Sequence, residues 1–101
     1  MKKYFINLTE KDRIRVEITV SKGKILNFVV QLETFLINNW EPAVRYNYAH
    51  GFPHKDLIFR NGKKIKENIS EESLSKIVNW AINELKINWK KYLRRCGFEK
   101  L

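Results

Sequence analysis

The segment formed by residues 45–56 contains both histidines of the chain, four residues apart on either side of a glycine–proline turn. Histidine is the side chain best suited to proton transfer near neutral pH. A tight turn can hold two imidazoles close together, and Arg45 lies just before it. We therefore predict that His50 and His54 are a catalytic acid–base pair, with Arg45 as the third catalytic residue.

This pair fits metal-independent cleavage of RNA. In that reaction one histidine takes the proton from a 2′-hydroxyl, and the other protonates the leaving 5′-oxygen. Arg45 would stabilise the negative charge that develops on phosphorus. The reaction needs no cofactor, and we expect none.

The same segment has two other interpretations. His50, His54 and Asp56 offer nitrogen and oxygen ligands that suit zinc. Alternatively the turn is structural, and the protein is a non-enzymatic nucleic-acid-binding or protein-interaction module. The residues alone leave both interpretations open.

The net charge of the chain is +9, from 20 basic and 11 acidic residues. A field of that sign attracts polyanions and speeds their encounter with the protein. Nucleic acid is the commonest of these in the cytoplasm, and phosphate contacts dominate its binding. We therefore expect RNA or another nucleic acid as a partner, although a solubilising surface without a partner would have the same charge.

The length of 101 residues predicts one domain, residues 1–101. A hydrophobic share of 44% is typical of a folded globule, and the apolar runs are too short to cross a membrane. The N-terminus lacks the features of a signal peptide, and the single cysteine cannot form an internal disulfide, so we expect a cytoplasmic protein. The chain has no glycine-rich phosphate loop, CxxC pair or nucleophile elbow.

Alternation of apolar and polar residues predicts four strands, at 13–20, 25–37, 43–50 and 54–60. Residues 38–42 are expected to be a loop, with its proline at the start of a strand. An Asn-Gly pair at 61–62 predicts a hairpin turn, followed by a short, lysine-rich return strand at 63–66. Residues 1–12 fit a short strand or a tail equally well.

Residues 71–95 are predicted to form one long helix, because their apolar residues repeat at helical spacing. Ser70 is its expected N-cap, and Ile69 and Leu74 have the spacing of a hydrophobic staple. Gly97 is expected to end the helix. The predicted fold is therefore α+β, an antiparallel four-stranded meander with the C-terminal helix on one face.

The sheet face away from the helix should be polar, and strand parity assigns to it Arg13, Arg15, Glu17, Gln31, Glu33, Arg45, Asn47, His54, Asp56 and Arg60. Such a face is either an ordinary solvated surface or a shallow groove for a phosphate chain. The predicted nucleic-acid contacts are Arg13, Arg15, Arg60 and Tyr48, together with the catalytic Arg45. By the same parity His50 points toward the core. Trp80 and Ile87 lie off the apolar stripe of the helix, and they predict a homodimer contact.

The run Arg45-Tyr46-Asn47-Tyr48-Ala49-His50-Gly51-Phe52-Pro53-His54-Lys55-Asp56 resembles a motif of small prokaryotic proteins, among them the TumE-type toxins of toxin–antitoxin modules. The motif starts with arginine, tyrosine and aspartate, and continues with a central histidine-glycine and a further histidine. Here Asn47 replaces the usual aspartate, and Asp56 stands where those toxins tend to have another histidine. The resemblance implies a toxin-like protein, with RNA cleavage as its expected activity and an antitoxin as its partner.

Overall fold

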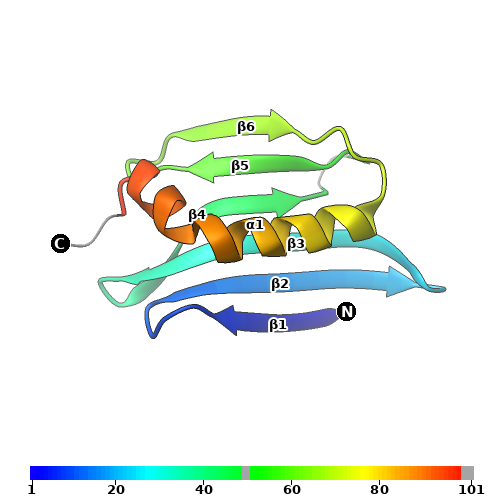
Figure 1. Ribbon diagram of the computed structural model, residues 1–101, viewed down its shortest axis with the longest axis horizontal. Coiled ribbons are helices and arrows are strands. Elements are labelled where there is room, and N and C mark those ends of the chain that lie inside the picture. Colours follow the sequence, from blue (N-terminus) through cyan, green and yellow to red (C-terminus); the bar gives the residue numbers. More distant parts are fainter. Residues whose placement is uncertain (49–50, 99–101) are drawn as a thin grey trace.

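Six antiparallel strands and one helix make up residues 1–48 and 51–98, the part of the chain that the computed structural model describes (Figure 1). The elements follow the chain in the order β1 (Lys2–Asn7), β2 (Asp12–Ser21), β3 (Lys24–Leu36), β4 (Asn39–Asn47), β5 (His54–Ile58), β6 (Lys64–Asn68) and α1 (Leu74–Arg95). Each strand pairs with the next in a single sheet. The antiparallel sheet with a C-terminal helix is as predicted.

The predicted number of four strands is wrong, because β1 and β6 extend the sheet at its two edges. Edge strands bury little surface, so their sequences show the strand pattern weakly. In β6 only Ile65 is even partly buried, and β1 interrupts its apolar–polar alternation with the exposed Phe5. The turn predicted at Asn61-Gly62 does join β5 to β6, and β6 corresponds to the short return strand predicted at 63–66.

The loop predicted at residues 38–42 is also wrong. Ile37 and Asn38 have φ values of 47° and 70° and form a tight turn, so that β4 begins already at Asn39. Pro42 lies inside β4, where the pairing with β3 changes register. A bulge accommodates a residue that has no N–H to donate to the ladder.

The helix begins at Leu74, three residues later than predicted. Its N-cap is Ser73 rather than Ser70, since the Ser73 side chain accepts a hydrogen bond from the backbone N–H of Lys76 at 3.3 Å. The predicted staple is therefore wrong as well. The backbone N–H of Ile69 donates to the Pro53 carbonyl at 3.1 Å, which holds Ile69 at the sheet. The chain needs the intervening residues to cross from the sheet to the helix layer.

The C-terminal end of α1 is as predicted. Gly97 has a φ of 86°, a left-handed value that suits glycine. Its N–H donates to the Arg94 carbonyl at 3.2 Å, and the Phe98 N–H donates to the Leu93 carbonyl at 2.8 Å. These two bonds satisfy carbonyls that the helix end would otherwise leave without partners.

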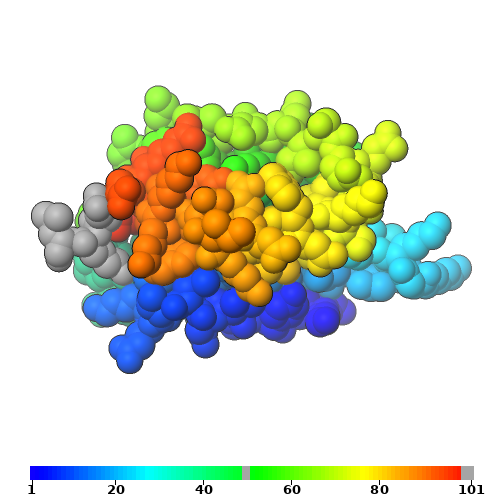
Figure 2. All heavy atoms as spheres, in the orientation of Figure 1, coloured from blue at the N-terminus to red at the C-terminus, as the bar shows by residue number. Residues whose placement is uncertain are grey.

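Helix α1 lies across the middle of the sheet, chiefly over β3 and β4 (Figures 1 and 2). The strands β1 and β2 run along one of its sides, and β5 and β6 along the other. The core between helix and sheet is fully buried and apolar, and it includes Ile14, Val16, Phe28, Val30, Leu32, Val44, Tyr46, Leu57, Ile77, Ala81 and Leu85. No helix in the described part of the chain is long and apolar enough to cross a membrane.

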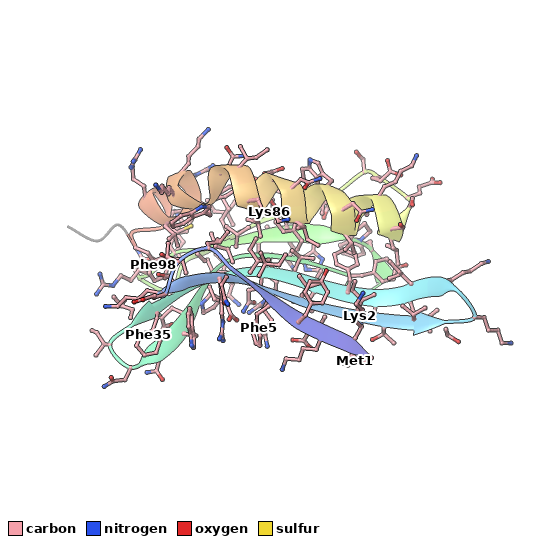
Figure 3. The ribbon with its side chains drawn as sticks, turned by 60° about the horizontal axis from the view of Figure 1, so that its bottom comes forward. Met1, Lys2, Phe5, Phe35, Lys86 and Phe98 are labelled. Carbon is pink, nitrogen blue, oxygen red and sulfur yellow. The ribbon has the colours of Figure 1, made fainter. Side chains whose placement is uncertain are left out.

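We call the opposite side of the sheet the open face, because the described residues place no other element over it. Figure 3 shows Phe5 and Phe35 projecting from this side, whereas Lys86 lies on the helix layer. Since successive side chains of a strand point to opposite faces, the polar residues of β2 to β5 gather on the open face.

Candidate functional site

The pairing of β4 with β5 builds a polar site on the open face. Arg45 lies opposite Asp56 in the ladder, and Asn47 lies opposite His54. The residue between His54 and Asp56, Lys55, points to the other face and contacts the helix. The register therefore brings Arg45 and His54, two of the three predicted catalytic residues, to one place.

These residues line a pocket of about 380 Å³, which we call the β4–β5 pocket, together with side chains from β3 and β6. Its lining consists of Asn27, Phe28, Val29, Arg45, Asn47, His54, Asp56 and Lys66. Two of these side chains are cationic and one is a carboxylate. Arginine and lysine are the side chains that most often bind phosphate. The composition suits a small anionic group.

His54 is held tightly in this pocket and is only 3% exposed. Its Nδ1 lies 3.4 Å from the Phe52 carbonyl oxygen, and its Nε2 lies 3.7 Å from Oδ2 of Asp56. A proton on Nδ1 would be directed at that carbonyl, and Nε2 would then be the nitrogen that accepts or releases a proton.

Arg45 is fixed by a chain of side-chain hydrogen bonds that crosses the open face. Its Nε donates to Oε1 of Gln31 at 2.6 Å, and Nε2 of Gln31 donates to Oε2 of Glu33 at 2.6 Å. The guanidinium is thus held through Nε while it lines the pocket. A fixed guanidinium loses little conformational freedom when it binds an anion.

The predicted phosphate contacts Arg13 and Arg15 belong to the same network. Arg13 Nε donates to Glu33 Oε1 at 2.8 Å, and Arg15 Nε lies 3.2 Å from Oε2 of the same carboxylate. Arg15 also pairs with Glu17 at 3.0 Å. Two carboxylates therefore offset much of the positive charge of these arginines, which makes them weaker phosphate contacts than their charge alone would indicate.

Sequence reasoning missed an aromatic feature beside this network. The Arg13 guanidinium lies 4.1 Å from the ring centre of Phe5 and 3.8 Å from that of Trp40. Phe35 meets Trp40 edge-on, with ring centres 5.3 Å apart. The sequence pattern places Trp40 in a loop and does not distinguish β1 from a tail. Correct placement of the β3–β4 turn would have revealed that Trp40 alternates onto the open face.

Tyr48 and Arg60 do not join the predicted nucleic-acid surface. Tyr48 is half-buried and packs against the core. Arg60 lies at the C-terminal end of α1, where its backbone N–H donates to the Cys96 carbonyl at 2.8 Å. The predicted nucleic-acid contacts therefore occupy three separate places: the open face for Arg13 and Arg15, the edge of the core for Tyr48, and the end of α1 for Arg60.

His50 lies outside the residues that the structure describes, so its pairing with His54 stays a prediction. The same holds for the alternative zinc site, which needs His50 as a ligand. Among residues 1–48 and 51–98, no group of three potential ligands from histidine, cysteine, aspartate and glutamate comes together.

The family model described as "Domain of unknown function (DUF7718)" matches residues 1–100. The chain belongs to this family. No curated protein and no solved structure matches it.

A second polar cluster of this DUF7718 chain lies on the other side of the sheet, under the helix. Nζ of Lys55 donates to Oε1 of Glu84 at 3.1 Å and contacts the Tyr92 hydroxyl at 2.6 Å. The Tyr92 hydroxyl also donates to Glu84. The Tyr46 hydroxyl is buried nearby and has no hydrogen-bond partner of good geometry within the described residues. The cluster links β4 and β5 to α1.

Burial and mutual contacts shift the pKa values of this cluster. Burial alone would lower the pKa of Lys55 and raise that of Glu84, but their hydrogen bonds to each other and to Tyr92 outweigh it. The pKa of Lys55 therefore lies above its ordinary value, and that of Glu84 lies below. Burial, together with the negative charge of Glu84, raises the pKa of Tyr46 far above its usual range. Lys55 and Glu84 thus form a stable ion pair rather than a reactive one.

Proposed function

We propose that this protein binds RNA on the open face of its sheet, with a backbone phosphate in the β4–β5 pocket. One observation carries the proposal: Arg45, Lys66 and His54 converge on a single pocket. The net charge of +9 favours a polyanionic ligand over a neutral one. Location in the cytoplasm, where RNA is abundant, is part of the proposal.

Arg45 and Lys66 have different roles in the proposed binding. Arg45 is fixed by Gln31 and presents a planar fork that matches phosphate geometry. Lys66 is exposed on the edge strand β6 and contributes a flexible point charge. Asp56 is the carboxylate of the pocket, and its Oδ2 lies 3.7 Å from Nε2 of His54.

The test measures the binding of a labelled, short single-stranded RNA by fluorescence anisotropy over a series of salt concentrations. Lys66→Ala is the main variant, because an exposed edge lysine can be removed without loss of packing. We expect weaker binding and a salt slope that is smaller by about one unit, since one phosphate contact is lost.

Lys86→Ala is the matched control. It removes the same charge from an exposed position on α1, in the layer opposite the open face (Figure 3). We expect it to change binding much less than Lys66→Ala does. Equal effects of the two variants would reduce the proposal to unspecific attraction, and absence of RNA binding by the unaltered protein would refute it.

Cleavage is the enzymatic form of this proposal, with His54 and His50 as the acid–base pair and Arg45 stabilising the phosphorus charge. The position of Arg45 and His54 in one pocket supports it. The near-complete burial of His54 favours the alternative, in which the protein binds RNA without cleaving it. Cleavage should persist in EDTA, yield cyclic phosphate ends, and stop with a 2′-deoxy substitution at the cut.

The resemblance to TumE-type toxins adds a cellular role to the enzymatic form, that of a toxin with an antitoxin partner. Growth arrest on expression, abolished by His54→Ala in a folded variant, would support this role. A homodimer is proposed separately, because Trp80 is 46% exposed on the helix flank. Light scattering that shows only a 12.2 kDa particle at micromolar concentration would refute the dimer.

A further inference from the structure

Three planar groups from three different strands stand together on the open face. They are Phe5 of β1, Arg13 of β2 and Trp40 of β4, and we call them the aromatic stack. The Arg13 guanidinium lies between the two rings, 4.1 Å from the centre of Phe5 and 3.8 Å from that of Trp40. Glu33 holds the guanidinium through its Nε at 2.8 Å. The arrangement is fixed before any ligand arrives.

The aromatic stack is separate from the hydrophobic core. The buried core lies between the sheet and α1, whereas Phe5 projects from the opposite side of the sheet and is 43% exposed (Figure 3). A large ring left half in water on an edge strand adds little to folding, because the hydrophobic gain follows the area removed from water. An exposed ring next to a fixed cation is, however, a favourable surface for another planar group.

We infer that the aromatic stack is a base-stacking subsite, and that the RNA bound by this protein is single-stranded. This inference rests on the proposed RNA-binding function. Every base has a π-face that stacks on an aromatic ring or on a guanidinium plane. Bases inside a duplex are already stacked on their neighbours and cannot use such a subsite without being extruded. The ring of Phe5 therefore selects strands whose bases are free.

The position of the aromatic stack relative to the β4–β5 pocket fits one bound strand. Phe5 lies on β1 and His54 on β5, which are four strand spacings apart. With about 4.8 Å between neighbouring strands, the two places are separated by roughly 19 Å across the sheet. The hydrogen-bonded side chains of Glu33 and Gln31 connect them. An RNA strand of a few nucleotides would place a phosphate in the pocket and a base on Phe5.

The test compares three labelled ligands of one length by fluorescence anisotropy: a single-stranded RNA, the same RNA annealed to its complement, and a strand with abasic positions throughout. Phe5→Leu removes the ring but keeps an apolar residue. We expect it to weaken binding of the single strand by about tenfold, which lies within the range found for the loss of one base–aromatic contact. Binding of the duplex and of the abasic strand should be unchanged by this substitution.

Trp80→Leu is the matched control, since Trp80 is exposed to nearly the same extent, 46%, but lies on the helix. It should leave binding of the single strand unaltered. Melting curves verify that both variants fold. Crosslinking with 4-thiouridine RNA gives a second measurement on the unaltered protein, in which the peptide containing Phe5 or Trp40 should be labelled.

Separate outcomes overturn the inference and the function on which it rests. If the unaltered protein binds duplex and single strand equally, or Phe5→Leu changes nothing while Lys66→Ala weakens binding, the stacking subsite is wrong and RNA binding stands. If the unaltered protein binds no RNA, both the stacking subsite and the proposed RNA-binding function are refuted. If light scattering shows a particle of twice 12.2 kDa that Phe5→Leu dissociates without any effect on RNA, the aromatic stack is a protein interface.

Discussion

The ion pair beneath the helix gives a prediction whose size follows from its surroundings. Glu84→Gln keeps the shape of the side chain and removes its charge, which leaves the ammonium of Lys55 without a charged partner. The two side chains are 12% and 17% exposed, between a surface pair and a fully buried one. Surface pairs contribute about 0–1 kcal/mol, and breaking a buried pair costs about 3–5 kcal/mol. We therefore expect a loss of about 2 kcal/mol in the free energy of unfolding.

The assay is thermal and urea unfolding followed by circular dichroism. For a domain of this size, about 2 kcal/mol corresponds to a decrease in Tm of roughly 8–16 °C. Lys55→Met should cost a similar amount. The double variant Lys55→Met/Glu84→Gln should be more stable than the sum of the single effects predicts, because each single substitution already breaks the same pair.

The dependence on pH has a defined sign. The pKa of Glu84 in the folded state lies below its ordinary value of 4.5, so the stability it contributes is complete above that pH and is lost as the pH falls through the lower folded value. The pKa of Lys55 is raised above 10.5, so its contribution is complete below that pH and is lost as the pH rises through the folded value. A difference between the unaltered protein and Glu84→Gln that is under about 0.5 kcal/mol at pH 7, or that grows in acid, would refute this account.

Three further predictions concern local structure, each measured by urea unfolding. Ser73→Ala should destabilise the protein by about 1 kcal/mol through loss of the N-cap, whereas Ser70→Ala should have no such effect; equal effects would contradict the observed helix start. Ile37→Asn should stabilise by about 1 kcal/mol, because Ile37 is 78% exposed and has a φ of 47° that asparagine tolerates better; a loss of stability would show that the side chain packs. Gly97→Ala should cost about 1–2 kcal/mol, because a φ of 86° is unfavourable for alanine. The added Cβ itself would not clash, since its nearest neighbour, Cβ of Arg60, lies 3.6 Å away; no cost would mean that the helix end rearranges.

The central part of the fold could be predicted because its residues are buried in a regular pattern. The alternation of Ile14 and Val16 with Arg13 and Arg15 identified β2, and Ile14 and Val16 do lie in the core. The edge strand β6 was predicted as the return strand of a hairpin from the Asn61-Gly62 turn, whereas β1 could not be distinguished from a tail, because an edge buries too little surface to impose alternation. The turn at Ile37 was missed because an isoleucine with positive φ follows from the pairing of β3 with β4 and not from local preference.

The candidate site was predictable in part. Arg45 and His54 belong to one continuous motif, and the parity of their strands was sufficient to place them on one face. Lys66 and Asn27 come from distant parts of the chain, and only the register of the sheet shows that they line the same pocket. The partners of Lys55 could not be identified either, since Glu84 lies 29 residues away in a helix whose rotation is set by packing.

Strand β5 has only five residues, and its neighbour at the edge of the sheet, β6, is mostly charged. Contacts with β6 therefore include few apolar residues that could fix the register of β5. A slip by one residue would reverse every side chain, turning His54 under the helix and Lys55 into the pocket. Lys55 reaches Glu84 only in the observed alignment. The ion pair under the helix, together with the buried Leu57, therefore favours the register that presents His54 and Asp56 on the opposite surface of the sheet.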